Sequence, residues 1–174
     1  MTEETFKKIC SRVPKGVTVV TARRPCDGLP IGVTVSAFTG VSLQPPTVLI
    51  CLKRDSMVTN LLLQVRYFAV NVLCEDQRDL SQRFATGSLE ARFCGLEWRE
   101  GLHSVPVLPG TLGHVVCEGG KSVADGDHEV VFGRVLEGSY AEGRCPLVYW
   151  ASAYQALKGA SPEVPGGIER YLHA

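Results

Sequence analysis

The order of apolar and polar residues predicts a short N-terminal helix followed mostly by strands. Apolar residues recur at the spacing of one helix face over residues 3–13, and Pro14 follows the last of them. Runs rich in β-branched residues predict strands over residues 17–22, from Ile31 onward, and over 47–53, 67–73, 112–118 and 129–136. Further helices are predicted over residues 57–64 and 75–85, with a short helical segment in AYQAL at 153–157.

The predicted strands outnumber the helices and follow one another at hairpin spacings. They do not alternate with long helices, as a parallel sheet would require. Residues 86–109 are rich in loop signals, and no internal repeat is found. The pattern therefore predicts a mainly β fold with peripheral helices, arranged as a small antiparallel barrel. A chain of 174 residues suits one such domain.

The stretch from Ile31 to Leu52 contains no charged residue, yet it includes several hydroxyl side chains. As one continuous strand, its odd positions from Ile31 to Leu43 would be mostly aliphatic and would face the core. Its even positions would present small and hydroxylated residues together with Phe38. A strand face that meets water usually carries Lys, Glu or Arg, and this one carries none. The pattern therefore predicts either a ligand-binding face or a subunit interface, and the two can coincide.

A basic turn lies just beyond this stretch. Lys53, Arg54 and Ser56 occupy the point at which a predicted strand passes into a predicted helix. A helix start with a hydroxyl and a nearby cation suits a phosphate group. The alternative is an ordinary helix cap between solvated charges, so the turn alone leaves both interpretations open.

Charge and cysteine content argue against several classes of function. The 18 Lys and Arg residues balance 18 Asp and Glu, so we expect neither nucleic acid nor a membrane as a partner. The seven cysteines include no CxxC pair and the four histidines show no HxxxH spacing, so we expect no metal site. The charged N-terminus, MTEETFKK, lacks the apolar core of a secretory signal, and the odd cysteine count argues against a disulfide framework. These features predict a cytoplasmic protein.

Common phosphate-binding motifs are absent or incomplete. No GxGxxG follows a predicted strand, which argues against a Rossmann domain. The GGKS at residues 119–122 resembles the end of a P-loop, but Val115 stands where the leading glycine is required. We expect a hairpin turn at GGKS instead.

Five segments, taken in order, resemble the short-chain flavin reductases, the reductase components of two-component flavin monooxygenases. The segments are GVTVVTA, DGLPIGVTVSAFTGVSLQPPTVLICL, RYFAVNVLCEDQRDLSQRFA, DGDHEVVFGRV and PLVYWASAY. The resemblance covers roughly residues 6–157, nearly the whole chain. The resemblance implies an FMN-binding split β-barrel that forms a homodimer. It further implies a reductase-like domain over residues 1–158 and a C-terminal tail over residues 159–174.

The resemblance also implies which residues bind the ligands. It puts one segment along the isoalloxazine ring of the flavin: Thr34, Val35, Ser36, Ala37, Phe38 and Thr39. It puts Cys51, Lys53 and Ser56 on the ribityl-phosphate side, with Arg83 and Phe84 near the flavin phosphate. His128 is implied to lie beside the nicotinamide, and Tyr149 and Tyr154 near the cofactor pocket.

The implied activity is transfer of a hydride from NADH or NADPH to FMN or FAD, with the reduced flavin passed to a partner oxygenase. A flavin carries the hydride chemistry itself, so the absence of a catalytic triad is no obstacle. Three alternatives stay open at this point: an electron carrier that holds its flavin tightly, a flavoenzyme acting on an organic substrate, and a non-catalytic ligand binder.

Overall fold

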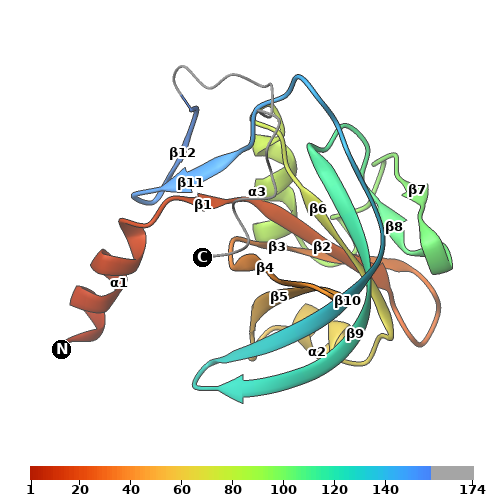
Figure 1. Cartoon of the computed structure of the whole chain (residues 1–174), viewed down its shortest axis with the longest axis horizontal. Helices are drawn as coiled ribbons and strands as arrows, with labels where there is room; N and C mark the ends of the chain where they lie inside the picture. The colour runs from red at the N-terminus through yellow and green to blue at the C-terminus, as the bar shows by residue number, and fades with distance from the viewer. Residues whose placement is uncertain (158–174) are drawn as a thin grey trace.

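The β-branched runs of the sequence form one antiparallel sheet of seven strands (Figure 1). In sheet order these are β3 (Pro30–Val35), β2 (Thr18–Arg23), β6 (Tyr67–Val72), β9 (Gly113–Asp125), β10 (His128–Tyr140), β5 (Pro46–Lys53) and β4 (Phe38–Leu43). β3 and β4 are the two edges of this order, yet only Ser36 and Ala37 separate them in the chain. The sheet therefore curls until its edges meet. The mainly β, antiparallel fold predicted from the sequence is confirmed.

Helices and short strands surround this sheet in the computed structural model, which describes residues 1–157. The predicted tail, 159–174, lies outside the described residues. The helices are α1 (Glu3–Ser11), α2 (Met57–Leu62), α3 (Arg78–Thr86) and the 3-10 turn η1 (Leu102–Ser104). Two smaller sheets join β1 (Lys15–Gly16), β11 (Val148–Trp150) and β12 (Ala153–Gln155), and β7 (Arg99–Glu100) with β8 (Pro106–Val107). Among residues 1–157, no helix combines the length and the apolar character needed to cross a membrane.

Two apolar clusters hold the barrel and its helices together. The first fills the barrel with side chains from one face of the sheet, and α2 closes one end of it through Val58 and Leu62. The second lies on the outer side of β2, where Val19 and Leu73 pack with Phe84 of α3. Burial of these side chains supplies the main driving force for the fold.

The predicted strand from Ile31 is in fact two strands, which changes the side chains that face the core. β3 ends at Val35 and β4 begins at Phe38. Val35 is buried, and Phe38 packs against the same barrel cluster. Residues three apart point to opposite faces of a regular strand, so both can face inward only because the chain breaks at Ser36–Ala37. The predicted alternation holds as far as Val35 and is wrong beyond it.

Two further local predictions are wrong. The AYQAL segment, predicted to be helical, contains strand β12, in which Tyr154 pairs with Tyr149 of β11. The GGKS predicted as a hairpin turn lies inside β9, and the turn comes later, at Gly126, where φ is 56°. In both places, pairing with a neighbouring strand outweighs the local preference of the segment.

Stability should depend on pH through His114 of β9, a residue that is 5% exposed. Its Nδ1 lies 3.1 Å from Oγ of Ser139, its Nε2 3.2 Å from a guanidinium nitrogen of Arg99, and Glu137 is 3.8 Å away. Burial, and then the charge of Arg99, lower the pKa of His114 from 6.5, and Glu137 only partly opposes them. The unfolded chain therefore binds this proton more readily than the folded one. The contribution is present above about pH 6.5 and is lost as pH falls through the folded pKa.

Urea unfolding on both sides of that pH should show this loss, with a slope of at most about 1.4 kcal/mol per pH unit from this one group. The variant His114→Gln should flatten that part of the profile. An unchanged profile in the variant would mean that another group carries the dependence.

Candidate functional site

The end of β5 and the start of β10 bring several predicted site residues onto one surface. The even-numbered residues of β5, from 48 to 52, are buried in the barrel, so the alternate residues Cys51 and Lys53 point outward. The strand register pairs His128 with Lys53, and Val130 with Cys51. His128 therefore lies beside Lys53 on the outer face of the barrel.

β4 extends this outer face, while the Ala37 that precedes it packs against the barrel cluster. The backbone N–H of Cys51 donates to the carbonyl of Ala37 at 3.0 Å, and Thr39 pairs with Leu49. Thr39 is exposed, and Ala37, Leu49 and Cys51 are half-buried. The space beside Gly40 is open, because a Cβ added there would meet no atom within 4 Å. The surface is thus open and uncharged. We call it the outer shelf, defined by Thr39, Leu49, Cys51 and Val130.

Polar groups stand at one end of the outer shelf. Nδ1 of His128 lies 2.8 Å from Oδ1 of Asp127. A carboxylate at this distance accepts, so Nδ1 carries the hydrogen and Nε2 is the nitrogen available to a ligand. The hydrogen bond and charge of His128 hold the pKa of Asp127 below its usual value. Ser56 precedes α2 with extended backbone, and its hydroxyl makes no capping bond to that helix.

A second group of predicted site residues meets at α3. The hydroxyl of Thr34 donates to the carbonyl of Ser81 at 2.6 Å, and Oγ of Ser81 lies 2.8 Å from the hydroxyl of Tyr154. The rings of Tyr154 and Tyr149 pack edge to face with centroids 5.3 Å apart, and Arg78 lies over Tyr154. Thr34 therefore uses its hydroxyl to join β3 to α3. The segment 34–39 therefore connects the residues at α3, through Thr34, with the outer shelf, through Thr39.

Four of the predicted cofactor-binding side chains have structural roles within residues 1–157. Phe84 has no exposed surface, and a Cβ on Gly32 would lie 2.7 Å from its ring. Val35 and Phe38 belong to the barrel interior. The guanidinium of Arg83 donates to the carbonyls of Ala91 and Cys94, which fixes the loop after α3. The Phe84 side chain thus supports α3, and the position of Arg83 and Phe84 near the flavin phosphate stays a prediction. Ser36 is half-exposed between the two groups.

Ser81 is the residue that sequence reasoning missed in this region. It is fully buried, and it precedes the equally buried Phe84 by three residues on α3. This i, i+3 spacing was the available signal, because it puts a polar residue on the apolar face of the helix. A buried hydroxyl needs a partner, and here it is the hydroxyl of Tyr154. The backbone carbonyl of Ser81 accepts separately from Thr34.

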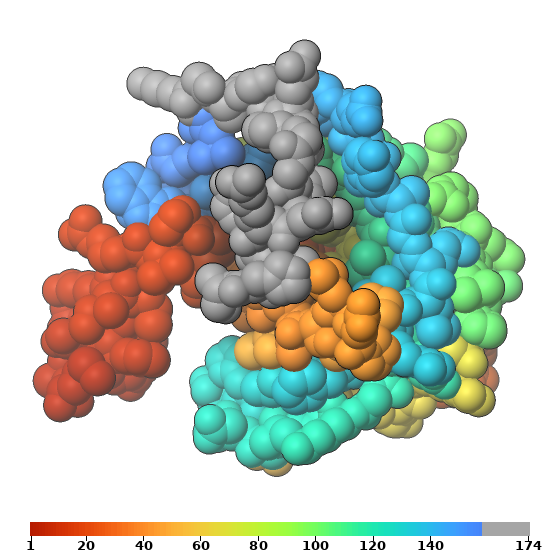
Figure 2. All heavy atoms as spheres, in the orientation of Figure 1, coloured from red at the N-terminus to blue at the C-terminus, as the bar shows by residue number. Residues whose placement is uncertain are grey.

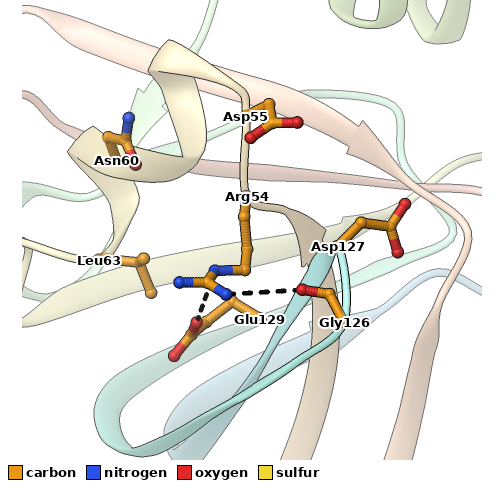
Figure 3. A pocket seen from close by; sticks show the side chains of 7 residues that line it. All are labelled: Arg54, Asp55, Asn60, Leu63, Gly126, Asp127 and Glu129. Carbon is orange, nitrogen blue, oxygen red and sulfur yellow. Dashed lines mark hydrogen bonds and ion pairs between the residues drawn. The ribbon is translucent and has the colours of Figure 1, made fainter.

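A pocket of about 450 Å³ lies close to His128, at the end of the barrel (Figure 3). It is lined by Arg54, Asp55, Asn60, Leu63, Gly126, Asp127 and Glu129. The hairpin and β5 are tied together here, because the Arg54 N–H donates to the carbonyl of Asp127 at 2.9 Å. Glu129 pairs with Leu52, whose side chain is buried inside the barrel, so it points to the opposite side of the sheet from His128.

Comparison with protein families identifies the class of protein to which these surfaces belong. The family model described as "Flavin reductase like domain" matches residues 10–158. The chain belongs to this flavin reductase family. The match includes the outer shelf, the residues that meet at α3 around Ser81, and the pocket.

Related proteins agree with this membership along most of their length. The flavin reductase (NADH) of Kitasatospora aureofaciens is 40% identical over 154 residues, which are 87% of this chain and 80% of that protein. The reductase subunit HsaB of a flavin-dependent monooxygenase of Rhodococcus jostii is 34% identical over 154 residues, 88% and 77% of the two chains. Among solved structures, nitrilotriacetate monooxygenase component B of Mycobacterium thermoresistibile has a TM-score of 0.85 and 30% identity, covering 99% of this chain and 97% of its own.

One solved relative contains both ligand types expected for the family. The NADH:FAD oxidoreductase SgcE6 of Streptomyces globisporus, in complex with NAD and FAD fragments, has a TM-score of 0.83 and 29% identity, covering 90% of this chain and 93% of its own. The residues of this flavin reductase fit a flavin. The outer shelf offers a flat, uncharged surface, and Lys53 adds a cation at the end where a phosphate would lie.

Proposed function

We propose that the chain transfers a hydride from NADH or NADPH to FMN or FAD on the outer shelf, beside His128. The observation that carries the proposal is the register of β5 and β10, which sets Cys51, Lys53 and His128 side by side. As a flavin reductase with relatives named flavin reductase (NADH) and FMN reductase (NADH), the chain is an NAD(P)H:flavin oxidoreductase.

Several residues on and around the shelf have defined parts in binding. A bound flavin supplies the hydride acceptor at N5, to which the nicotinamide C4 must come within roughly 3–3.5 Å in a stacked arrangement. Thr39 leaves room for such a stack because its side chain is small and exposed. Lys53 and the hydroxyl of Ser56 hold the phosphate side, and Nε2 of His128 bonds the carboxamide or phosphate of the nicotinamide cofactor. Tyr149 and Tyr154, which pair between β11 and β12, are assigned to the cofactor pocket on the side of α3.

The product of this reaction is reduced flavin, which a second enzyme must consume. Relatives are named as reductase components of a flavin-dependent monooxygenase and of a resorcinol hydroxylase. We propose a flavin-dependent oxygenase as the partner of this chain, and a homodimer as its working form. The apolar, half-exposed outer shelf and the exposed apolar stripe of α1 support a second copy packed on this side.

The direct test mixes purified protein, NADH or NADPH, and an excess of FMN or FAD, and follows the nicotinamide absorbance. We expect turnover well above the uncatalysed rate with at least one pair. Absence of turnover with every pair would reject the proposed function. A protein whose flavin is reduced by another reductase, but not by NAD(P)H, would instead be an electron carrier.

Two substitutions separate the nicotinamide and flavin parts of the site. His128→Ala should raise the KM for NADH about tenfold and leave flavin affinity nearly unchanged, because one hydrogen bond to a charged or polar group is lost. Ser56→Ala should weaken flavin binding by about 1 kcal/mol with little effect on the KM for NADH. Steady-state kinetics and flavin titration measure both. His103→Ala, an exposed histidine beside Tyr67, is the matched control. Wild-type values in both variants would mean that the ligands bind elsewhere.

A further inference from the structure

The carboxylate of Asp127 determines which nitrogen of the His128 ring carries the hydrogen. Oδ1 of Asp127 lies 2.8 Å from Nδ1 of His128. The hydrogen bond and charge of His128 hold the pKa of Asp127 below its usual value, so this carboxyl group is ionised at neutral pH. An ionised carboxylate accepts hydrogen bonds and donates none. The hydrogen of a neutral His128 ring is therefore on Nδ1, and Nε2 presents a lone pair.

The hairpin turn between β9 and β10 does not need this carboxylate. Gly126 and Asp127 are the two residues between the register partners Asp125 and His128. Gly126 has a φ of 56°, and φ of Asp127 is not positive, which is the pattern of a type II′ turn that requires glycine only at its first central position. The backbone carbonyl of Asp127 accepts from the Arg54 N–H at 2.9 Å, and any residue at position 127 would keep that bond. The acidic side chain is thus available for another role.

The surroundings of Asp127 leave its carboxylate to His128. In the part of the chain that the structure describes, the only ion pair of Asp127 is with His128. Figure 3 shows the carboxylate directed away from the guanidinium of Arg54. The side chains of His128 and Asp127 are 48% and 74% exposed. Nε2 of His128 is therefore open to a ligand on the outer shelf while Nδ1 is occupied.

A lone pair on Nε2 restricts the groups that the ring can bind. An acceptor needs a donor, and the carboxamide of a nicotinamide has an NH₂ group, as the side chains of Asn and Gln do. An ionised phosphate has only acceptors, so it would require a ring that carries hydrogen on both nitrogens. Lys53, the register partner of His128 on β5, is the group suited to a phosphate. The geometry thus assigns the carboxamide to His128 and the phosphate to Lys53.

We propose that Asp127 is a positioning residue: it holds the hydrogen of His128 on Nδ1, so that Nε2 accepts a hydrogen bond from the amide N–H of the nicotinamide. This inference rests on the proposed function and names the group that His128 recognises. A fixed amide sets the rotation of the nicotinamide ring over the flavin, which matters because hydride transfer needs C4 aligned with N5. The chain should accordingly discriminate against reduced cofactors that lack the amide N–H.

The first experiment observes the ring directly, without flavin or nicotinamide. Nitrogen NMR of isotope-labelled histidines distinguishes a ring nitrogen that carries hydrogen from one with a lone pair, and His128→Ala assigns the signal by its loss. At about pH 8, where an ordinary imidazole is neutral, we expect the hydrogen on Nδ1 of His128. Asp127→Ala should move it to Nε2 in a large share of molecules, and Asp127→Asn, which keeps an acceptor oxygen, in fewer. Hydrogen mainly on Nε2 in the wild-type protein would overturn the proposal.

The second experiment compares NADH with its acetylpyridine analogue, in which a methyl group replaces the amide nitrogen. The measured quantity is the ratio of kcat/KM for NADH to kcat/KM for the analogue. We expect Asp127→Ala to lower this ratio about tenfold, through a higher KM for NADH, and Asp127→Asn to lower it less. The matched control is Asp125→Ala, which removes an exposed acid from the same hairpin and should keep the wild-type ratio.

Charge alone predicts the opposite result for these variants. NADH is an anion, so loss of a nearby negative charge would lower its KM in Asp127→Ala, Asp127→Asn and Asp125→Ala alike. That pattern, or an unchanged ratio in Asp127→Ala, would overturn the proposal. Absence of turnover with every pair of cofactors would instead count against the proposed function, and the NMR experiment would still show whether Asp127 orients the ring.

Discussion

Replacing Phe84 with alanine should lower the free energy of unfolding by about 3–5 kcal/mol, a large effect for one substitution. The side chain is fully buried, and its ring packs edge to face against Phe93 with centroids 5.0 Å apart. The same ring lies against Gly32, which leaves room for it only because glycine has no Cβ. Removal of the ring would leave a cavity between α3 and β3 that the backbone cannot easily close.

Urea unfolding measures this loss, and Phe84→Leu is the matched control, with an expected loss of less than about 1.5 kcal/mol. The flavin affinity of the folded fraction should change little in either variant. A Phe84→Ala protein with near wild-type stability and much weaker flavin binding would contradict the structural role. It would restore the ligand contact that the family resemblance implies.

Phe84 shows which features of the site the sequence predicts and which it does not. Its helix, and the strands that precede and follow it along the chain, are predicted from the 3.6-residue and two-residue periods of apolar residues. The family segments then brought Arg83 and Phe84 to the neighbourhood of the flavin, without saying which side chain faces the ligand. That choice depends on Gly32, 52 positions earlier in the chain, where the absence of a side chain admits the ring.

The strand register explains why some predicted site residues share a face and why the alternation predicted for the stretch from Ile31 fails. Cys51, Lys53 and His128 share a face because β5 and β10 pair without a slip between Thr47 and Lys53. For segment 34–39 the assumed alternation fails after Val35, since a two-residue break rotates the next strand. No local signal marks that break: Ser36 and Ala37 suit a strand as well as a turn. The break follows from closure of the barrel, which only long-range pairing determines.

The pocket at Glu129 could not be predicted from the sequence either, because it too depends on long-range pairing. Its lining comes from the turn after β5, from α2 and from the β9–β10 hairpin. In the sequence, Glu129 looks like one acid in a run of β-branched residues, as on any solvent-facing strand. Only the pairing with Leu52 shows that it points inward.

If the protein is the homodimer proposed above, introducing two glutamates into α1, as Phe6→Glu with Ile9→Glu, should convert it to a monomer. Phe6, Ile9 and Val13 follow the spacing of one helix face, yet they are 54%, 54% and 56% exposed. α1 has only nine residues and buries none of them against the rest of residues 1–157. A helix of this length is marginal in water unless an apolar face is packed, so the stripe requires a partner surface.

The position of α1 indicates a second copy of this chain as that surface. Figure 2 shows α1 standing away from the barrel, on the side where the β9–β10 hairpin ends. Its attachment runs through its C-terminal end, where the carbonyls of Ser11 and Arg12 accept hydrogen bonds from Ala151 and Trp150. Figure 2 also shows a gap between α1 and the end of the hairpin, where β10 begins with His128. A symmetric partner seated there would cover the apolar stripe and the outer shelf together.

Burial of two large apolar side chains contributes about 3–6 kcal/mol, so the variant should dimerise at least about a hundredfold more weakly. Sedimentation velocity measures the state, and Lys8→Gln, on the polar face of α1, should remain dimeric. Flavin affinity should fall along with dimerisation, because a shelf open to water on one side loses the wall that a partner provides. A monomeric wild-type protein would refute the dimer itself. A variant that stays dimeric and active would show that the two copies meet through another surface, and the apolar stripe of α1 would then need a different partner.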